Sequence, residues 1–357
     1  NVTNTGKVKG IATYNAGVAG FVQQGAVLDG VKNYGEITSS AAYVAGVAAY
    51  VYEDAEFNKC VNYGNISSSV AAGYAAGIAA TALPSKFVEC VNEGQISSGS
   101  SAGIVANCSG KSGGLIYTFD RCQNNGEVTG NGILGGITAV QGATAGNNVC
   151  HYIQCVNNGD ITATATQAVS SSAMAGIAAF YSPGSVFEYC INTGFVTNTK
   201  SVYTAGIAAN NKGSATADYP VVFKGCVNTG NIASSAQQIA GIVAYITNYT
   251  SVDSCLNYGT IEQGIWGAAG ICYTMAGTTS SLTNCINYGD VSVTQYNAGG
   301  IVGNCASTTA VIENCVNVGN ITSTTTAEKN NYGVGGIAGS SYATMKNCFN
   351  AGKVVGK

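Results

Sequence analysis

One block of residues recurs along this chain at nearly regular intervals. It reads Cys-x-Asn-x-Gly-x-Ile or Val, where x is any residue, and its clearest copy runs from Cys60 to Ile66. A period of about 20 to 50 residues is the signature of a repeat architecture, so this block constrains the fold more than any other feature. Twelve copies, 29 to 36 positions apart, align on their glycines at Gly6, Gly35, Gly64, Gly94, Gly126, Gly159, Gly194, Gly230, Gly259, Gly289, Gly319 and Gly352.

A second block, Ala or Gly followed by Gly and then Ile or Val, lies between the copies of the first. Helical repeats also have periods of this length, but β-branched residues dominate here and each unit carries several glycines. No window has the apolar stripe of a 3.6-residue period. The second block is centred on Gly17, Gly46, Gly77, Gly103, Gly136, Gly176, Gly206, Gly241, Gly270, Gly300 and Gly336.

The spacing of apolar residues predicts corners in each repeat. An apolar or aromatic residue stands three positions before each Cys position, as Phe57 does before Cys60, with polar residues between them. Strand side chains alternate between two faces, so two inward residues at an odd spacing indicate a bend. Each coil is therefore expected to contain two or three short strands joined at tight corners.

These features predict an all-β fold, a single-stranded parallel β-helix (β-solenoid) of about 11–12 rungs with roughly 30 residues per rung. Stacked coils pair strand on strand at ~4.8 Å per rung, which gives a rod on the order of 55 Å long. Residues 1–357 are expected to form one continuous array without an evident capping unit.

Each inward position of such a fold becomes a column of like side chains. Asn side chains in a column hydrogen-bond amide to amide along the axis, which satisfies buried polar groups from rung to rung. The Gly two residues after each Asn is interpreted as a position that needs a positive φ. The predicted Asn ladder comprises Asn62, Asn92, Asn124, Asn157, Asn192, Asn228, Asn257, Asn287 and Asn317.

The Cys position also forms a column, and Val2 and Val31 occupy it in the first two copies. Val at this position indicates an apolar slot, which favours buried free thiols. Disulfides between adjacent rungs are the alternative. Metal ligation is disfavoured because no CxxC pair or His cluster accompanies the column, and we expect no cofactor. The column comprises Cys60, Cys90, Cys122, Cys155, Cys190, Cys226, Cys255, Cys285, Cys315 and Cys348.

Four cysteines lie off this column: Cys108, Cys150, Cys272 and Cys305. Cys108 and Cys150 fall in predicted loops of neighbouring rungs, where they form a candidate clasp.

The charge content excludes several functions. Only 9% of residues are charged and the net charge is −3, so no basic field for nucleic acid exists. No apolar stretch reaches the ~18 residues of a membrane span. Glycan-degrading solenoids need clustered carboxylates, and the best dyad here, Glu127 and Asp160, is interpreted as two solvated side chains. His151 is the only His, so we expect the chain not to be an enzyme.

Tyrosine is the enriched side chain with binding potential, at 21 copies. Tyr34 and Tyr63 share one outward column, as do Tyr258 and Tyr288. Exposed aromatic columns bind sugar faces or pack against another rod, although stacked Tyr side chains also simply stabilise a ladder. Longer connections near 107–117, 141–151 and 211–221 predict loops at one corner, another candidate for binding.

The unit from Gly299 to Gly303, followed by Ile312, Cys315, Asn317 and Gly319, resembles the GLUG-motif repeat, and so does the unit from Gly335 to Gly339. Most other copies read Ala-Gly-Ile-Ala-Ala in place of the glycine-flanked form. The GLUG-motif family consists of repetitive surface-exposed and secreted bacterial proteins, adhesins among them. The resemblance implies an extracellular β-solenoid stalk or adhesive surface and brings no catalytic residues.

The first functional hypothesis is therefore an extracellular structural or adhesive surface protein. The chain begins and ends inside the same repeat block, which is expected of a segment of a longer protein or of rods that stack head to tail into a filament. Partners would be further copies of the rod, another cell-surface protein or a glycan. The alternative is a carbohydrate-binding module using the Tyr columns and corner loops, and a solenoid polysaccharide-degrading enzyme ranks third.

Overall fold

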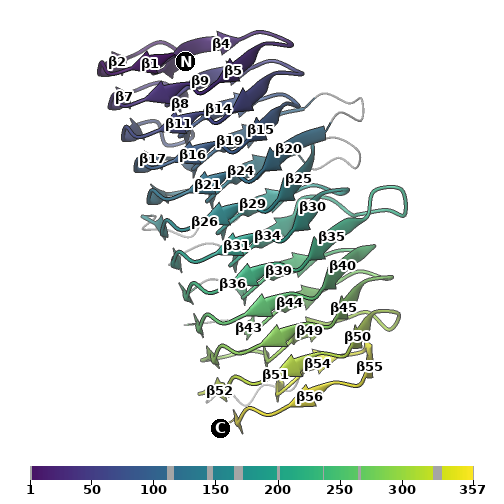
Figure 1. Ribbon diagram of the computed structural model, residues 1–357. Coiled ribbons are helices and arrows are strands. Elements are labelled where there is room, and N and C mark those ends of the chain that lie inside the picture. Colours follow the sequence, from purple (N-terminus) through teal and green to yellow (C-terminus); the bar gives the residue numbers. More distant parts are fainter. Residues whose placement is uncertain are drawn as a thin grey trace.

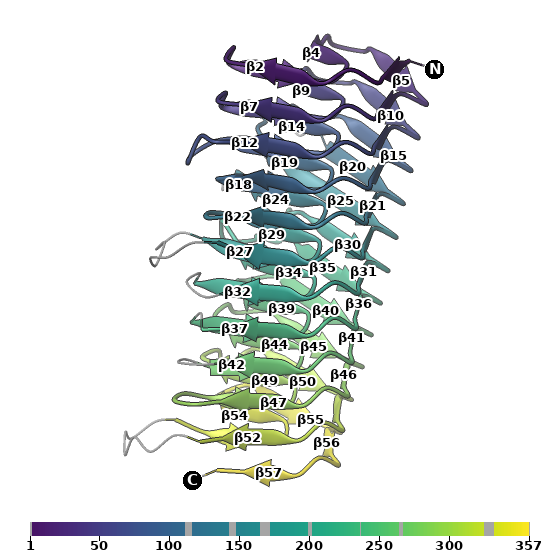
Figure 2. The same ribbon diagram turned by 90° about the vertical axis from the view of Figure 1, so that its left-hand side faces the viewer.

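The computed structural model describes residues 2–110, 116–142, 148–164, 172–198, 202–235, 237–263, 267–324 and 332–356. In these ranges every regular element is a β-strand and none is a helix. The strands pair in parallel and stack rung upon rung from the N-terminus to the C-terminus (Figures 1 and 2). The predicted β-solenoid is confirmed.

Each coil contains five short strands, so the prediction of two or three was wrong. The second coil consists of β6 (Lys32–Asn33), β7 (Ile37–Ser39), β8 (Tyr43–Ala45), β9 (Ala48–Val51) and β10 (Glu56–Asn58). Strands of two to four residues are too short to produce a readable alternation of apolar and polar side chains. The sequence pattern therefore merged neighbouring strands into longer ones.

Equivalent strands of successive coils form five sheets, named A to E in the order in which a coil visits them. Sheets A and B have 12 strands and sheets C, D and E have 11. Sheet A runs from β1 (Thr3–Asn4) to β56 (Phe349–Asn350), and sheet B runs from β2 (Val8–Gly10) to β57 (Val354–Val355). Sheet C runs from β3 (Tyr14–Ala16) to β53 (Val334–Gly335), and sheet D runs from β4 (Ala19–Val22) to β54 (Ala338–Ser341). Sheet E runs from β5 (Val27–Asp29) to β55 (Thr344–Lys346).

The register places matching residues of adjacent repeats side by side. Asn62 pairs with Asn92 in sheet A, and Phe57 pairs with Phe87 in sheet E. The buried aromatic column that begins at Phe57 stacks ring on ring, with centroids 4.5 to 5.3 Å apart as far as Phe223. Such offset stacking adds to the stabilisation that burial provides.

The predicted corner before each Cys position is confirmed and has a common backbone geometry. Lys59, immediately before Cys60, has φ of 53°, in the left-handed region. The matching residues of the other rungs also have positive φ, and two of them, Gly30 and Gly225, are glycines. One left-handed residue per coil thus turns the chain from sheet E into sheet A.

The interior is divided into two apolar lobes. One lobe lies between sheets D and E and contains Val51, Phe57 and Cys60, whereas the other lies between sheets B and C and contains Ile37 and Val44. The bend between sheets C and D turns inward and meets the Asn ladder, which separates the two lobes. Each coil is therefore V-shaped in cross-section, with an inner angle between the outer faces of sheets C and D.

Candidate binding surface and supporting ladders

The Asn ladder is continuous and fully satisfied at each described rung. The side-chain amide Nδ2 of Asn62 donates to Oδ1 of Asn92 at 2.8 Å and to the carbonyl of Gly64 at 2.8 Å. The same pair of bonds recurs at each predicted position, and the Asn side chains between Asn33 and Asn317 are buried. The structure extends the ladder to three residues that the prediction omitted, Asn4, Asn33 and Asn350.

The Gly that follows each ladder Asn is explained by close packing and not by positive φ. Gly64 is not among the residues with positive φ, so this prediction was wrong. A Cβ atom at Gly64 would overlap the carbonyl group of Gly35, one rung before. The glycines of this column therefore let the backbones of successive rungs approach at a corner.

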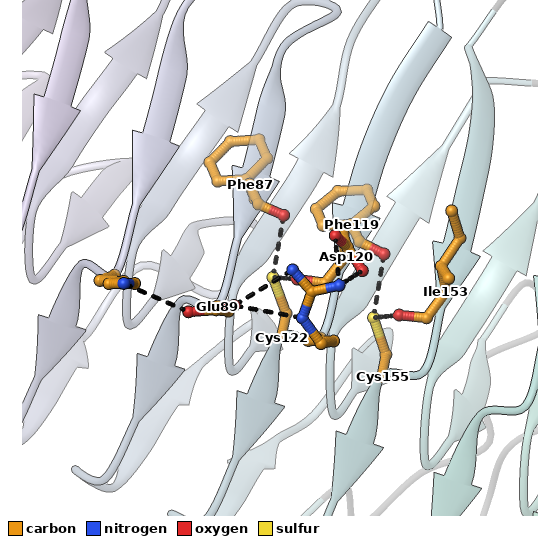
Figure 3. A network of polar contacts seen from close by, with 9 residues as sticks. Phe87, Glu89, Phe119, Asp120, Cys122, Ile153 and Cys155 are labelled. Carbon is orange, nitrogen blue, oxygen red and sulfur yellow. Dashed lines mark hydrogen bonds and ion pairs between the residues drawn. The ribbon is translucent and has the colours of Figure 1, made fainter.

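The Cys column consists of buried thiols except for the half-buried Cys348, and all fourteen cysteines of the chain are free. The Sγ of Cys122 donates to the carbonyl of Phe87 at 3.2 Å, and the Sγ of Cys155 donates to that of Phe119 at 3.2 Å (Figure 3). Burial raises the pKa of Cys122 well above its ordinary value, as do hydrogen bonds with the neighbouring thiols. Hydrogen bonds from the neighbouring thiols lower the pKa of alternate members such as Cys90, and the column is thus a packed part of the core.

The proposed clasp residues meet in the core and not in loops. Cys108 ends β19 (Val105–Cys108) and Cys150 lies in β25 (Val149–Ile153), and both are buried. Burial, followed by a hydrogen bond to Cys150, raises the pKa of Cys108. The two thiols are therefore adjacent.

The two carboxylates that form the best dyad in the sequence lie on adjacent rungs. Glu127 and Asp160 occupy equivalent positions of adjacent rungs, beside the paired residues Val128 and Ile161. The Asp160 carboxylate accepts a hydrogen bond from the backbone N–H of Phe195 at 2.8 Å, which ties it to the next rung. Among the described residues, no group of three or more His, Cys, Asp or Glu side chains is placed to hold a metal ion.

One predicted corner loop borders a small apolar cavity. The connection after β34 (Ala208–Asn211) is described throughout and is visible beside β35 (Val221–Lys224) in Figure 1. With Tyr219 and Pro220 it closes a cavity of about 240 Å³ that His151 also lines. Burial lowers the pKa of His151. The other two predicted loops fall largely on residues 111–115 and 143–147, which lie outside the described residues.

The predicted Tyr pairs are brought together. The ring centroids of Tyr34 and Tyr63 are 4.6 Å apart at an interplanar angle of 7°, and those of Tyr258 and Tyr288 are 4.6 Å apart at 4°. Each ring covers one face of its partner, the contact by which stacked side chains stabilise a ladder. This geometry favours the ladder-stabilising interpretation for these four residues.

A larger aromatic surface, which sequence analysis did not identify, lines the inner angle between sheets C and D. Small residues of the two sheets pack against one another at its floor, for example Ala76 and Ala102 of sheet C with Ala106 of sheet D, and all three are buried. Outward side chains of neighbouring sheets meet in this way only where the outer surface is concave. We call this concave surface the C–D groove.

Six aromatic side chains gather at the N-terminal end of the C–D groove. Tyr14, Tyr43 and Tyr74 form a stacked column on sheet C with centroid distances of 4.9 and 5.6 Å. Tyr50 of sheet D meets Tyr14 edge to face at 86°. We define the aromatic cluster as Tyr14, Phe21, Tyr43, Tyr50, Tyr52 and Tyr74.

The aromatic cluster has a distinct electrostatic environment. Burial raises the pKa of Tyr50, and the neighbouring Tyr52, Tyr14 and Tyr43 add to the shift. The phenol of Tyr50 is therefore a neutral hydrogen-bonding group at physiological pH. Further along the groove, Tyr203 and Tyr245 meet at 5.7 Å, and Nζ of Lys212 lies 4.0 Å from the ring centroid of Phe180.

A sequence signal for the C–D groove exists and was overlooked. Aromatic residues recur three positions before the glycine of the second block, as Tyr43 does before Gly46, and four positions after it, as Tyr50 does. The first block is nearly invariant from copy to copy. The positions that flank the second block vary, and only some copies carry an aromatic residue there, whereas others carry small or polar residues such as Ser100, Thr81 and Asn107.

Comparisons with known proteins do not assign the chain to a family: no protein-family model, no curated protein and no solved structure matches it. The resemblance to the GLUG-motif repeat therefore stays a prediction. Across the described ranges, the structure has no helix with the length and apolarity needed to cross a membrane.

Proposed function

We propose that this chain is a rigid rod in an extracellular surface protein and that it serves a structural or adhesive role. The observation that carries this proposal is the Asn ladder, which runs without interruption from Asn4 to Asn350. Each buried amide has its partner in the next rung, so bending or slipping of one rung would leave polar groups unsatisfied. A ladder of this kind suits a stiff spacer.

The composition and the repeat resemblance support the same role. A chain with only 9% charged residues offers little for nucleic acid, and the GLUG-motif resemblance implies a secreted or surface-exposed rod. We also propose that the chain is not an enzyme. If alanine at both Glu127 and Asp160 abolished a measured polysaccharide-degrading activity, this second proposal would be wrong.

End-to-end association of rods is a further part of the proposal. The strands of the first and last coils have an unpaired edge, and residues of the core columns are exposed there, such as Val2 at 54% and Met345 at 43%. Unpaired edges accept further β-strands. Coils of the same polypeptide or of a second copy would cover both edges.

Two experiments test the proposal. Antibody labelling of intact cells of the source organism should detect the rod without permeabilisation, and labelling only after permeabilisation would contradict a surface role. Electron microscopy of the purified chain should show filaments of stacked rods. Met345→Glu, which places a charge on one end, should shorten them, whereas Thr38→Glu on an exposed side of a rung should not. Single rods at every concentration would contradict end-to-end stacking.

A further inference from the structure

We propose that the N-terminal part of the C–D groove binds an uncharged polysaccharide, with the aromatic cluster as its contact surface. The inference rests on the adhesive part of the proposed function and is independent of filament formation. The proposed ligand is a neutral glycan chain. The proposed site differs from the Tyr34–Tyr63 and Tyr258–Tyr288 pairs.

The shape of the groove suits a chain-like ligand. The angle between the sheets is packed with columns of small residues, such as Ala45 and Ala76 on sheet C and Ala49 and Ala80 on sheet D, all buried. These columns run along the rod axis, because each residue is in register with its counterpart one rung away. The aromatic side chains that cover them follow the same axis, and a linear polymer can therefore lie lengthwise on these rings.

The charge distribution selects a neutral ligand. The described strands of sheets C and D contain no Asp, Glu, Lys, Arg or His, although they span the length of the rod. Sheet E, in contrast, carries charges such as Glu56 and Lys86, which form an ion pair at 2.9 Å. Nucleic acid or an anionic lipid surface would need cationic contacts that these strands lack.

The ring arrangement in the cluster suits sugars. Tyr50 of sheet D and Tyr52, which directly follows β9, are tilted by 60° to one another, and Phe21 and Tyr50 by 43°. Tilted rings leave parts of their faces uncovered, and the side chain of Tyr52 is 37% exposed. The apolar C–H face of a pyranose packs on such rings while phenol hydroxyls bond to the sugar hydroxyls.

Polar, uncharged side chains continue the surface beyond the rings. In sheet D the register carries Tyr50 onto Thr81, which is buried, and then onto the partly exposed Asn107. In sheet C it carries Tyr74 onto Ser100. Hydroxyl and amide groups next to aromatic rings are the combination that recognises the alternating apolar faces and hydroxyl rims of a sugar chain.

A second copy of the chain is the main alternative occupant. Each of the two copies would present a concave groove lined at its base by small residues. Two concave surfaces are not complementary to each other in shape. An extended neutral polymer fits a concave surface of this kind better, which is why we place a glycan there.

The test is affinity electrophoresis of the purified chain in gels containing soluble neutral polysaccharides, namely a β-glucan, an α-glucan, a xylan and a galactomannan. At least one polymer should retard the native chain. Tyr50→Ala together with Tyr52→Ala should weaken that retardation at least tenfold. Tyr34→Ala with Tyr63→Ala, which removes an exposed ring pair elsewhere, is the matched control and should leave it unchanged.

Circular dichroism and thermal melting establish that each variant folds, and Tyr52→Ala alone provides a milder variant if the double variant does not. The proposal is overturned if none of these polymers retards the chain, if only charged polymers do, or if Tyr52→Ala binds as tightly as the native chain. It is also overturned if the cluster substitutions abolish a concentration-dependent dimer instead. Surface labelling and filament formation would stand in each of these cases, so failure of the glycan site is distinguishable from failure of the rod.

Discussion

The side-chain amide of Asn62 lies directly behind the bend at Gly46 and donates to Oδ1 of Asn92 at 2.8 Å. One residue thus connects two rungs and supports the inner angle from the core side. The C–D groove and the Asn ladder are therefore two sides of one structural feature.

Removing one ladder amide should destabilise the rod. In Asn92→Ala, the Nδ2 of Asn62 loses one of its two acceptors and keeps only the carbonyl of Gly64, while Oδ1 of Asn124 loses the donor from Asn92. Buried polar groups without partners cost about 1–3 kcal/mol. Urea unfolding followed by circular dichroism should give a lower midpoint than for Thr38→Ala, an exposed position of sheet B. Equal midpoints would show that the ladder contributes nothing.

Adding a methyl group at the inner bend should be more damaging than adding one on the open surface. A Cβ atom at Gly46 would overlap the Asn62 amide and the carbonyl of Gly77, whereas a Cβ at Gly20 has nothing within 4 Å. Overpacking of this kind costs about 1–3 kcal/mol. Gly46→Ala should therefore melt at a lower temperature than Gly20→Ala. A reversed order would contradict the V-shaped cross-section.

Relieving the left-handed corner should stabilise the rod. Gln154 has φ of 52° at the position that Gly225 occupies two rungs later. Glycine avoids the penalty of roughly 1–2 kcal/mol for a left-handed residue but loses more chain entropy, so Gln154→Gly should gain less than about 1 kcal/mol. Gln154→Val should lower the denaturation midpoint. The corner geometry is refuted if Val proves more stable than Gly.

The thiols should differ in reactivity according to their burial. Cys348 is half-buried, whereas the other cysteines are buried, and burial raises the pKa of Cys122. Only the thiolate reacts with alkylating agents, so Cys348 should be labelled first in the native chain. Peptide mass spectrometry after timed alkylation measures the order. Disulfide-linked peptides in the chain before reduction would support the alternative of bonds between rungs.

Stability should fall at alkaline pH. Burial raises the pKa of Tyr117 and Tyr181 above the ordinary 10.0, so their neutral form is favoured in the folded state. Above pH 10 the unfolded chain binds fewer protons than the folded one, and stability decreases as pH rises. Urea midpoints should therefore decline above pH 10, and unfolding should add phenolate absorbance beyond that of the tyrosines that are exposed in the folded chain. A constant midpoint would contradict this.

Much of the architecture was determined by the sequence alone. Because identical residues such as Asn62 and Asn92 recur at intervals of 29 to 36 positions and a stacked coil satisfies their amides, the repeat predicted both the solenoid and its register. The corner before Cys60 was likewise readable, because an odd spacing between inward residues is incompatible with a straight strand.

The tertiary structure alone decided the number of strands, the role of the glycines and the binding surface. Strands this short carry too few side chains to show which residues face inward and which face outward. The inward bend at Gly46 could therefore not be predicted from the sequence. Gly64 is required by the carbonyl of Gly35, a neighbour in space and not in sequence. Tyr43 and Tyr50 face one groove for the same reason: the direction of an outward side chain depends on how sharply two sheets meet, which is a property of packing between elements.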